Sequence, residues 1–235
     1  MATISASGIG ELLTGGRTAE SYILRKAIEG AGFKRELQTK EMRHGLINQY
    51  EAYEIFLSDL GKWHDIYTPI DERCGASADV LSDDMVYDIK CPYYIDTFLE
   101  QKNKLPKKYY YQVQMQMIAE KKNKGAVLLY LTANEVDIYG NTIEYNIPIE
   151  YRHYIHHFEK DDKVQYEIMT AVDRYYPTLL EWAKNLKNAI EIDEDDFFYS
   201  QYTGEKKLRK IKTASNIDNA TKSAIIHKGE FYYEI

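Results

Sequence analysis

The chain has 235 residues, of which 44% are hydrophobic and 29% charged, and its formal net charge is −7. This length is enough for one α/β domain with a substantial core, and the negative charge argues against a protein that coats nucleic acid electrostatically. Two cysteines are too few for a four-cysteine iron–sulfur site. The sequence shows no signal peptide and no apolar run of membrane length, so we expect no membrane partner and a cytoplasmic location.

The first part of the chain alternates between helical and strand patterns. Residues 17–31 predict an amphipathic helix that ends before Gly32. A second helix is expected over 38–60, stopped by Gly61, with an inward apolar stripe. That stripe consists of Ile47, Tyr50, Phe56 and Leu57. Short strands are expected near 64–68, 75–81 and 85–91.

The second part continues the alternation. Pro92 closes the strand before it because proline cannot donate to a ladder. Further elements are predicted from periodicity: helices near 95–102 and 107–122, a central strand at 126–132, a paired neighbour at 141–149, and a helical segment over 151–190 that is broken or kinked near Pro177. These elements predict an α/β fold with a mixed sheet. We expect one domain over 1–235, with 191–235 as a candidate C-terminal extension.

The most informative stretch is Gly75 to Pro92, GASADVLSDDMVYDIKCP. Asp88 and Lys90 are two apart on a predicted strand and therefore share one face. A hairpin across Ser82–Asp84 would bring Asp79 to them. Two carboxylates and an ammonium suit a divalent metal and a phosphate, because Mg²⁺ prefers oxygen ligands and lowers the pKa of bound water. The alternative is an exposed hairpin with a surface ion pair, which contributes little to stability.

Four stretches in order carry a resemblance to a known family. They are ISASGIGELLT (4–14), MRHGLINQYEAYEIF (42–56), the 75–92 stretch and KKYYYQVQMQMIAEKKNKGAVLLY (107–130). Together they resemble the lambda-exonuclease-like viral recombinase family, a branch of the PD-(D/E)xK nuclease superfamily. The resemblance spans about residues 4 to 131. It implies a restriction-endonuclease-like core, in which a central mixed β-sheet is flanked by helices.

The resemblance also implies roles for residues of the central block. Asp79 and Asp88 would bind the metal, with the Ile89 carbonyl as a further ligand. Lys90 would be catalytic. Gln112, the first glutamine of Gln-Val-Gln, would lie beside the scissile phosphate.

Two features depart from the family pattern. The active-site glutamate of the first long helix falls on Gln49, and a small shift would bring in Glu51 as a metal ligand. Ser7 and Ser77 match serines that hold a terminal 5′-phosphate, but no arginine precedes Ser7. Candidates for that positive charge are Arg17, Arg25 and Arg43. If none of these arginines supplies the charge, the protein recognises DNA ends in a different way from the family.

The resemblance therefore implies an Mg²⁺-dependent DNA exonuclease, with Mn²⁺ able to substitute. It would degrade linear duplex DNA from its ends, in the 5′-to-3′ direction, during phage or mobile-element recombination in the host cytoplasm. A single-strand annealing protein and a homo-oligomer are the expected partners. Two alternatives stay open: an endonuclease with the same metal site, and an inactive DNA-binding module on the nuclease fold.

Overall fold

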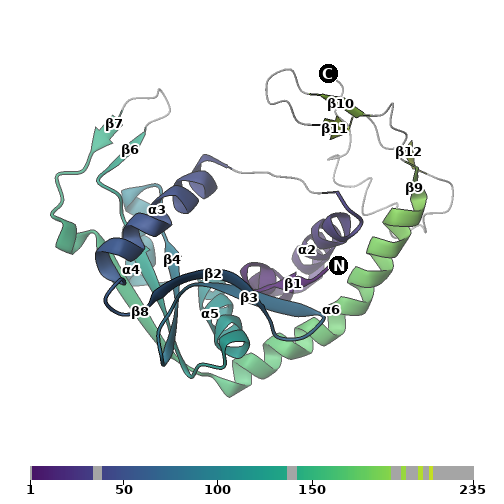
Figure 1. The fold of residues 1–235 in the computed structure, drawn as a ribbon, viewed down its shortest axis with the longest axis horizontal. Helices are drawn as coiled ribbons and strands as arrows, with labels where there is room; N and C mark the ends of the chain where they lie inside the picture. The colour runs from purple at the N-terminus through teal and green to yellow at the C-terminus, as the bar shows by residue number, and fades with distance from the viewer. Residues whose placement is uncertain are drawn as a thin grey trace.

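The computed structural model describes residues 2–33, 39–136, 142–191, 197–199, 206–208 and 212–213. A six-stranded mixed sheet forms the centre, and helices pack on both of its faces (Figure 1). The predicted α/β class is therefore confirmed. The helices are η1 (Ala6–Gly8), α1 (Ile9–Thr14), α2 (Gly16–Gly30), α3 (Lys40–Phe56), α4 (Ile95–Asn103), α5 (Lys107–Glu120), η2 (Ile149–Tyr151) and α6 (Asp162–Ala189). The strands of the main sheet are β1 (Ile4–Ser5), β2 (Lys62–Pro69), β3 (Cys74–Leu81), β4 (Met85–Lys90), β5 (Lys124–Tyr130) and β8 (His153–Glu159).

Strand β3 organises the part of the sheet that matters for the site. Along one edge it pairs with β2, over Lys62–Pro69. On the other edge it takes two partners: β1 in parallel at Cys74–Gly75, and β4 in antiparallel at Val80–Leu81. Because β1 and β4 pair with opposite ends of that edge, a fork opens between them along residues 76–79 of β3.

The predicted hairpin and the central strand are both confirmed. Strands β3 and β4 pair across the turn, where the Ser82 N–H donates to the Met85 carbonyl at 3.0 Å. Strand β5 lies between β4 and β8, and all but the first of its residues are buried. It runs parallel to β4, so the chain must cross over between them, which it does through α4 and α5.

Helix α3 begins directly after a capping threonine, but fewer of its apolar side chains are buried than the sequence pattern predicts. The Thr39 side chain accepts a hydrogen bond from the Met42 N–H and thereby caps the first turn. The expected apolar stripe is only half confirmed: Leu57 is fully buried, whereas Ile47 and Tyr50 are exposed by 65% and 53%. Only the C-terminal end of α3 packs on the sheet, through Ala52 to Leu57.

Two predictions for the later part of the chain are wrong. Residues 153–159, expected to be helical, form strand β8, and this strand is the neighbour of β5. The segment 141–149, which was expected to pair with the central strand, instead contains β7 (Thr142–Glu144), and β7 pairs with β6 (Asn134–Val136). Tyr154, His156 and Phe158 alternate along β8, a period of two that is typical of a strand, but the segment leads directly into the long pattern of α6. Helix α6 then continues past Pro177 without a break.

The N-terminal helices and α6 form a second core beside the sheet. Side chains of α1, α2 and α6 pack together, including Leu12, Ile23 and Leu179. None of the helices in the described ranges is both long and apolar enough to cross a membrane. From residue 190 onward the described pieces are short strands: β9 (Ile190–Glu191), β10 (Phe197–Tyr199), β11 (Lys206–Leu208) and β12 (Lys212–Thr213). Most of the expected C-terminal extension lies outside the described residues, so it stays a prediction.

Candidate active site

The fork between β1 and β4 opens into a cavity of about 340 Å³. It is lined by Ser5, Ala6, Ser7, Leu46, Gln49, Asp65, Tyr67, Ala76, Ser77, Asp79, Asp88, Lys90 and Gln112. The lining thus includes Asp79, Asp88, Lys90 and Gln112, the four residues that the sequence predicted as catalytic. Sheet topology gathers them, because β3 and β4 separate beyond Val80–Tyr87 and leave room for side chains.

Asp79 takes the place of a missing strand partner at the fork. Its Oδ2 accepts a hydrogen bond from the Ile89 N–H at 2.5 Å, where a backbone carbonyl would otherwise serve. The residue is 9% exposed. Because one oxygen of the carboxylate is tied to β4, Asp79 is held at the wall of the cavity.

Asp88 is surrounded by donors on both oxygens. Its Oδ2 lies 2.8 Å from Lys90 Nζ, which confirms that the two side chains share a face of β4. Its Oδ1 accepts from Gln112 Nε2 at 2.7 Å and from Gln116 Nε2 at 3.0 Å. Gln116, which lies one helical turn after Gln112 on α5, also donates to the Ser77 carbonyl at 2.7 Å. Helix α5 therefore ties β3 and β4 together at the site.

The electrostatics of the cavity follow from burial and from the close carboxylates. Burial and the neighbouring Asp88 carboxylate raise the pKa of Asp79 to about 7. Burial alone would lower the pKa of the Lys90 ammonium, but Asp88 and Asp79 outweigh it and raise that pKa above its ordinary value. Lys90 is therefore a cation at neutral pH, and in this state it cannot act as a general base.

The donor set fits a hard divalent cation. Asp79 and Asp88 offer carboxylate oxygens, and the buried Asp88 Oδ2 contacts the Lys90 ammonium without accepting a well-aligned hydrogen bond. Ile89, whose carbonyl is the further candidate ligand, directly follows Asp88 in the chain. Across the residues that the structure describes, no cluster of three His, Cys, Asp or Glu side chains is arranged as a complete metal site. Two carboxylates and a carbonyl leave further positions to water, as Mg²⁺ prefers.

The structure decides between Gln49 and Glu51. Gln49 lines the cavity, and its Nε2 donates to the Ile89 carbonyl at 3.1 Å. Glu51 is directed elsewhere: its Oε1 accepts from the Tyr130 hydroxyl at 2.9 Å. Glu51 is absent from the cavity lining, so its predicted role as a metal ligand has no support in the geometry. At 3.6 residues per turn, two helix positions that are two apart point about 200° away from each other, so only one can face the site.

Three serines line the other end of the cavity. Ser7 and Ser77 are present as predicted, and Ser5, which the sequence analysis missed, joins them. The Ser5 Oγ lies 3.1 Å from the Ser7 Oγ, and the Ser5 N–H donates to the Tyr22 hydroxyl at 2.9 Å. A Cβ on Gly8 would lie 1.9 Å from the Tyr22 ring, so this position requires glycine.

Arg43 is not part of this cavity. It lies on the exposed side of α3 and is absent from the lining, so its predicted role in phosphate binding has no support in the geometry. Arg25 is bound to Glu11 at 2.7 Å. Among the lining residues, Lys90 is the cation, and it is already paired with Asp88.

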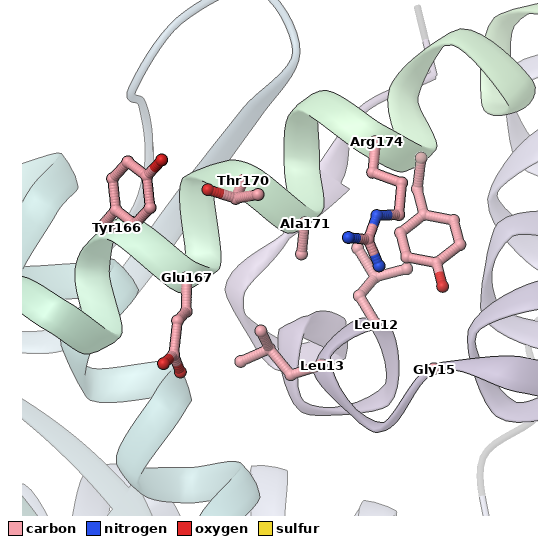
Figure 2. Close-up of a pocket in the computed structure, with 9 residues that line it drawn as sticks. Leu12, Leu13, Gly15, Tyr166, Glu167, Thr170, Ala171 and Arg174 are labelled. Atoms are coloured by element: carbon pink, nitrogen blue, oxygen red, sulfur yellow. The ribbon is translucent and has the colours of Figure 1, made fainter.

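A second cavity, of about 310 Å³, lies between the end of α1 and the first half of α6 (Figure 2). Leu12, Leu13 and Ala171 form its apolar part, and Glu167 and Arg174 are its charged groups. Its lining holds one carboxylate and one guanidinium, so it lacks the paired carboxylates that a metal centre needs. The fork is therefore the candidate active site.

A mixed sheet with helices on both faces and an open fork beside its central strands is the restriction-endonuclease-like α/β fold, and this is the fold class of the chain. It is similar to the crystal structure of an alkaline exonuclease, LHK-Exo, from Laribacter hongkongensis, with a TM-score of 0.65 at 22% identity over 80% of this chain and 92% of that chain. A complex of LHK-Exo with dAMP gives a TM-score of 0.64. A phage-related exonuclease from Haemophilus somnus 129PT gives 0.65 at 16% identity, over 76% of this chain and 95% of that chain. No protein-family model and no curated protein matches the chain. The fold that the sequence motifs implied is thus confirmed.

Proposed function

We propose that this protein is a metal-dependent deoxyribonuclease that degrades linear duplex DNA from its ends. The observation that carries the proposal is the convergence of Asp79, Asp88 and Lys90 in one cavity at the sheet fork. Two of the solved structures with this fold are named as exonucleases, which supports the end-directed activity. As the family resemblance implies, the direction is 5′-to-3′ and the setting is phage or mobile-element recombination.

Different residues of the site would bind the metal and stabilise the charge on the phosphate. Asp79, Asp88 and the Ile89 carbonyl would hold Mg²⁺, or Mn²⁺ in its place. When bound, the metal would lower the pKa of a water molecule and neutralise charge that develops on the phosphate. Lys90, a cation already fixed by Asp88, would stabilise that charge at a preorganised position.

Gln112 and the serines would position the substrate. Gln112 lies on the partly exposed side of α5, so its amide can turn from Asp88 toward a phosphate oxygen. Ser5, Ser7 and Ser77 would accept the terminal nucleotide at the far end of the cavity. Their hydroxyls can donate to phosphate oxygens without adding charge.

The proposed partners are double-stranded DNA ends, a single-strand annealing protein and further copies of this chain. Exposed apolar side chains on α3, Met42, Ile47 and Tyr50, support a surface that another molecule covers. Light scattering on the purified protein tests the homo-oligomer against the monomer mass of 27.5 kDa.

The test compares linear duplex DNA with covalently closed circles of the same sequence in the presence of Mg²⁺. Lys90→Ala serves as the inactive variant, and Lys184→Ala, on the exposed face of α6, serves as its matched control. We expect digestion of the linear DNA alone by the wild type and Lys184→Ala. Loss of one preorganised cation lowers the rate by about 10²–10³-fold. Cutting of the circles would replace the proposal with an endonuclease, and no cutting at all would leave a DNA-binding module.

A further inference from the structure

Strand β2 carries an irregularity at the level of the active site. Its pairing with β3 shifts between Trp63–Val80 and Ile66–Ala78. Across this interval β2 advances by three residues and β3 by two, so β2 contains one extra residue. The extra residue forms a β-bulge whose place on β3 is Asp79. Bulges are frequent next to active sites, because they redirect a side chain.

The residue redirected by this bulge is Asp65. Its backbone lies in the left-handed region, with φ 41°, which side chains other than glycine, asparagine and aspartate rarely adopt. The two neighbouring residues of the bulge have different surroundings. His64 Nε2 lies 3.4 Å from Glu120 Oε1 at the end of α5, whereas Asp65 lines the cavity. The bulge therefore brings a third carboxylate to the wall that holds Asp79 and Asp88.

The charges of the cavity call for more than one compensating cation. Three carboxylates, from Asp65, Asp79 and Asp88, face a single ammonium, that of Lys90. Lys90 is already paired with Asp88. Helix α3 contributes the neutral Gln49. Carboxylates that share a site repel one another unless a cation lies among them.

We propose that Asp65 is the third carboxylate of the metal centre and that it holds, with Asp79, a second divalent cation. In this protein the bulge of β2 would supply the negative charge that α3 does not. Asp65 would act directly or through a coordinated water molecule, since Mg²⁺ keeps several waters. The inference rests on the proposed function, because it assumes a first metal at Asp79 and Asp88.

The experiment counts Mn²⁺ ions bound to the protein without DNA, by isothermal titration calorimetry and by the electron paramagnetic resonance of free Mn²⁺. The proteins compared are the wild type, Asp65→Asn, and Asp59→Asn as a control that removes the same charge from an exposed turn. Asparagine tolerates a positive φ, so Asp65→Asn removes the charge while the backbone conformation is kept. Asp65→Gly, which also accepts this backbone, is the second variant.

We expect two bound ions in the wild type and in Asp59→Asn. Both Asp65 variants should retain the tighter ion and bind the weaker one about 10–100-fold less tightly. Binding of two ions with unchanged affinity by Asp65→Asn and Asp65→Gly would overturn the inference, as would a single ion in the wild type. Neither result would contradict the proposed first metal at Asp79 and Asp88. Absence of any bound ion in the wild type would overturn the metal-dependent function as well.

Discussion

At the scale of single residues, the most consequential group of the site is the carboxylate of Asp79, which is largely buried. Asp79 is held by the Ile89 N–H and lies beside the Asp88 carboxylate, and its pKa is raised to about 7 by burial and by that neighbour. A proton and a metal ion therefore compete for the same group near neutral pH. This competition gives the site a pH dependence that an exposed aspartate would not have.

We predict that the affinity for Mn²⁺ rises as pH increases through about 7 and levels off above it. Below that pH, binding must first displace the proton from Asp79. The measurement is a calorimetric titration at several pH values between 5.5 and 8.5. A flat profile over this range would show that Asp79 is ionised throughout.

The same shift predicts how stability depends on pH in the metal-free protein. The pKa of Asp79 is raised above its ordinary value of 3.8, so the folded state holds the proton more tightly than the unfolded state does. The free energy of unfolding should therefore fall as pH rises from about 4 to about 7. Urea denaturation across this range checks it, and Asp79→Asn should remove the slope.

At the scale of elements, α5 acts as the tie between β3 and β4. Gln116 is fully buried and donates to both the Ser77 carbonyl and Asp88 Oδ1. Gln112, one turn earlier, is partly exposed and donates to Asp88 alone. Two glutamines of one helix thus differ in what they stabilise, although both reach the same carboxylate.

We predict that Gln116→Met lowers the free energy of unfolding by about 1–3 kcal/mol, because two buried acceptors lose their donor. Gln112→Met should cost less stability and more activity, since that side chain faces the cavity. Denaturation curves and nuclease rates on the two variants check the contrast. Equal losses of stability would argue against the tie.

Helix α3 brings a different side chain to the site from the one expected. Glu51 bonds to Tyr130 in the cluster beneath α3, and Gln49 faces the cavity. We predict that Glu51→Gln keeps wild-type metal affinity and cleavage and lowers the free energy of unfolding by no more than about 1 kcal/mol. Mn²⁺ titration and rate measurements check this. Asp79→Asn is the comparison that should lose both metal and activity.

At the scale of the whole molecule, residues from the chain start, β3 and α5 line one cavity, the proposed site of the terminal nucleotide. Its far end presents the hydroxyls of Ser5, Ser7 and Ser77, and its cation is engaged at the near end. A hydrogen bond from a hydroxyl to a phosphate is worth about 1.5–3 kcal/mol, and no lining cation adds to it. End recognition should therefore depend weakly on the charge of the DNA terminus.

We predict that a 5′-phosphorylated duplex is degraded only about ten- to a hundredfold faster than the same duplex with a 5′-hydroxyl. The measurement compares initial rates on the two substrates, and Ser7→Ala should reduce the difference. A 5′-hydroxyl end that resists degradation completely would show that a cation beyond the cavity lining takes part.

The sequence by itself determined the local part of this protein. The hairpin of β3 and β4, the pairing of Asp88 with Lys90 and the central strand β5 could be predicted, because period-two alternation and turn residues act over a few positions. The aromatic residues of β8 alternate in the same way, yet the strand was missed because it leads directly into a long helical pattern.

Only the tertiary structure decided which distant residues meet. The fork exists because β1 and β4 share one edge of β3, which depends on pairings between segments about 70 residues apart in the case of β1. Whether Gln49 or Glu51 faces the site depends on the rotation of α3 about its axis, a difference of two positions that family spacing leaves open. Asp65 carries no motif at all: one extra residue in β2, visible only in the register with β3, accompanies its place in the lining of the cavity that holds the aspartates.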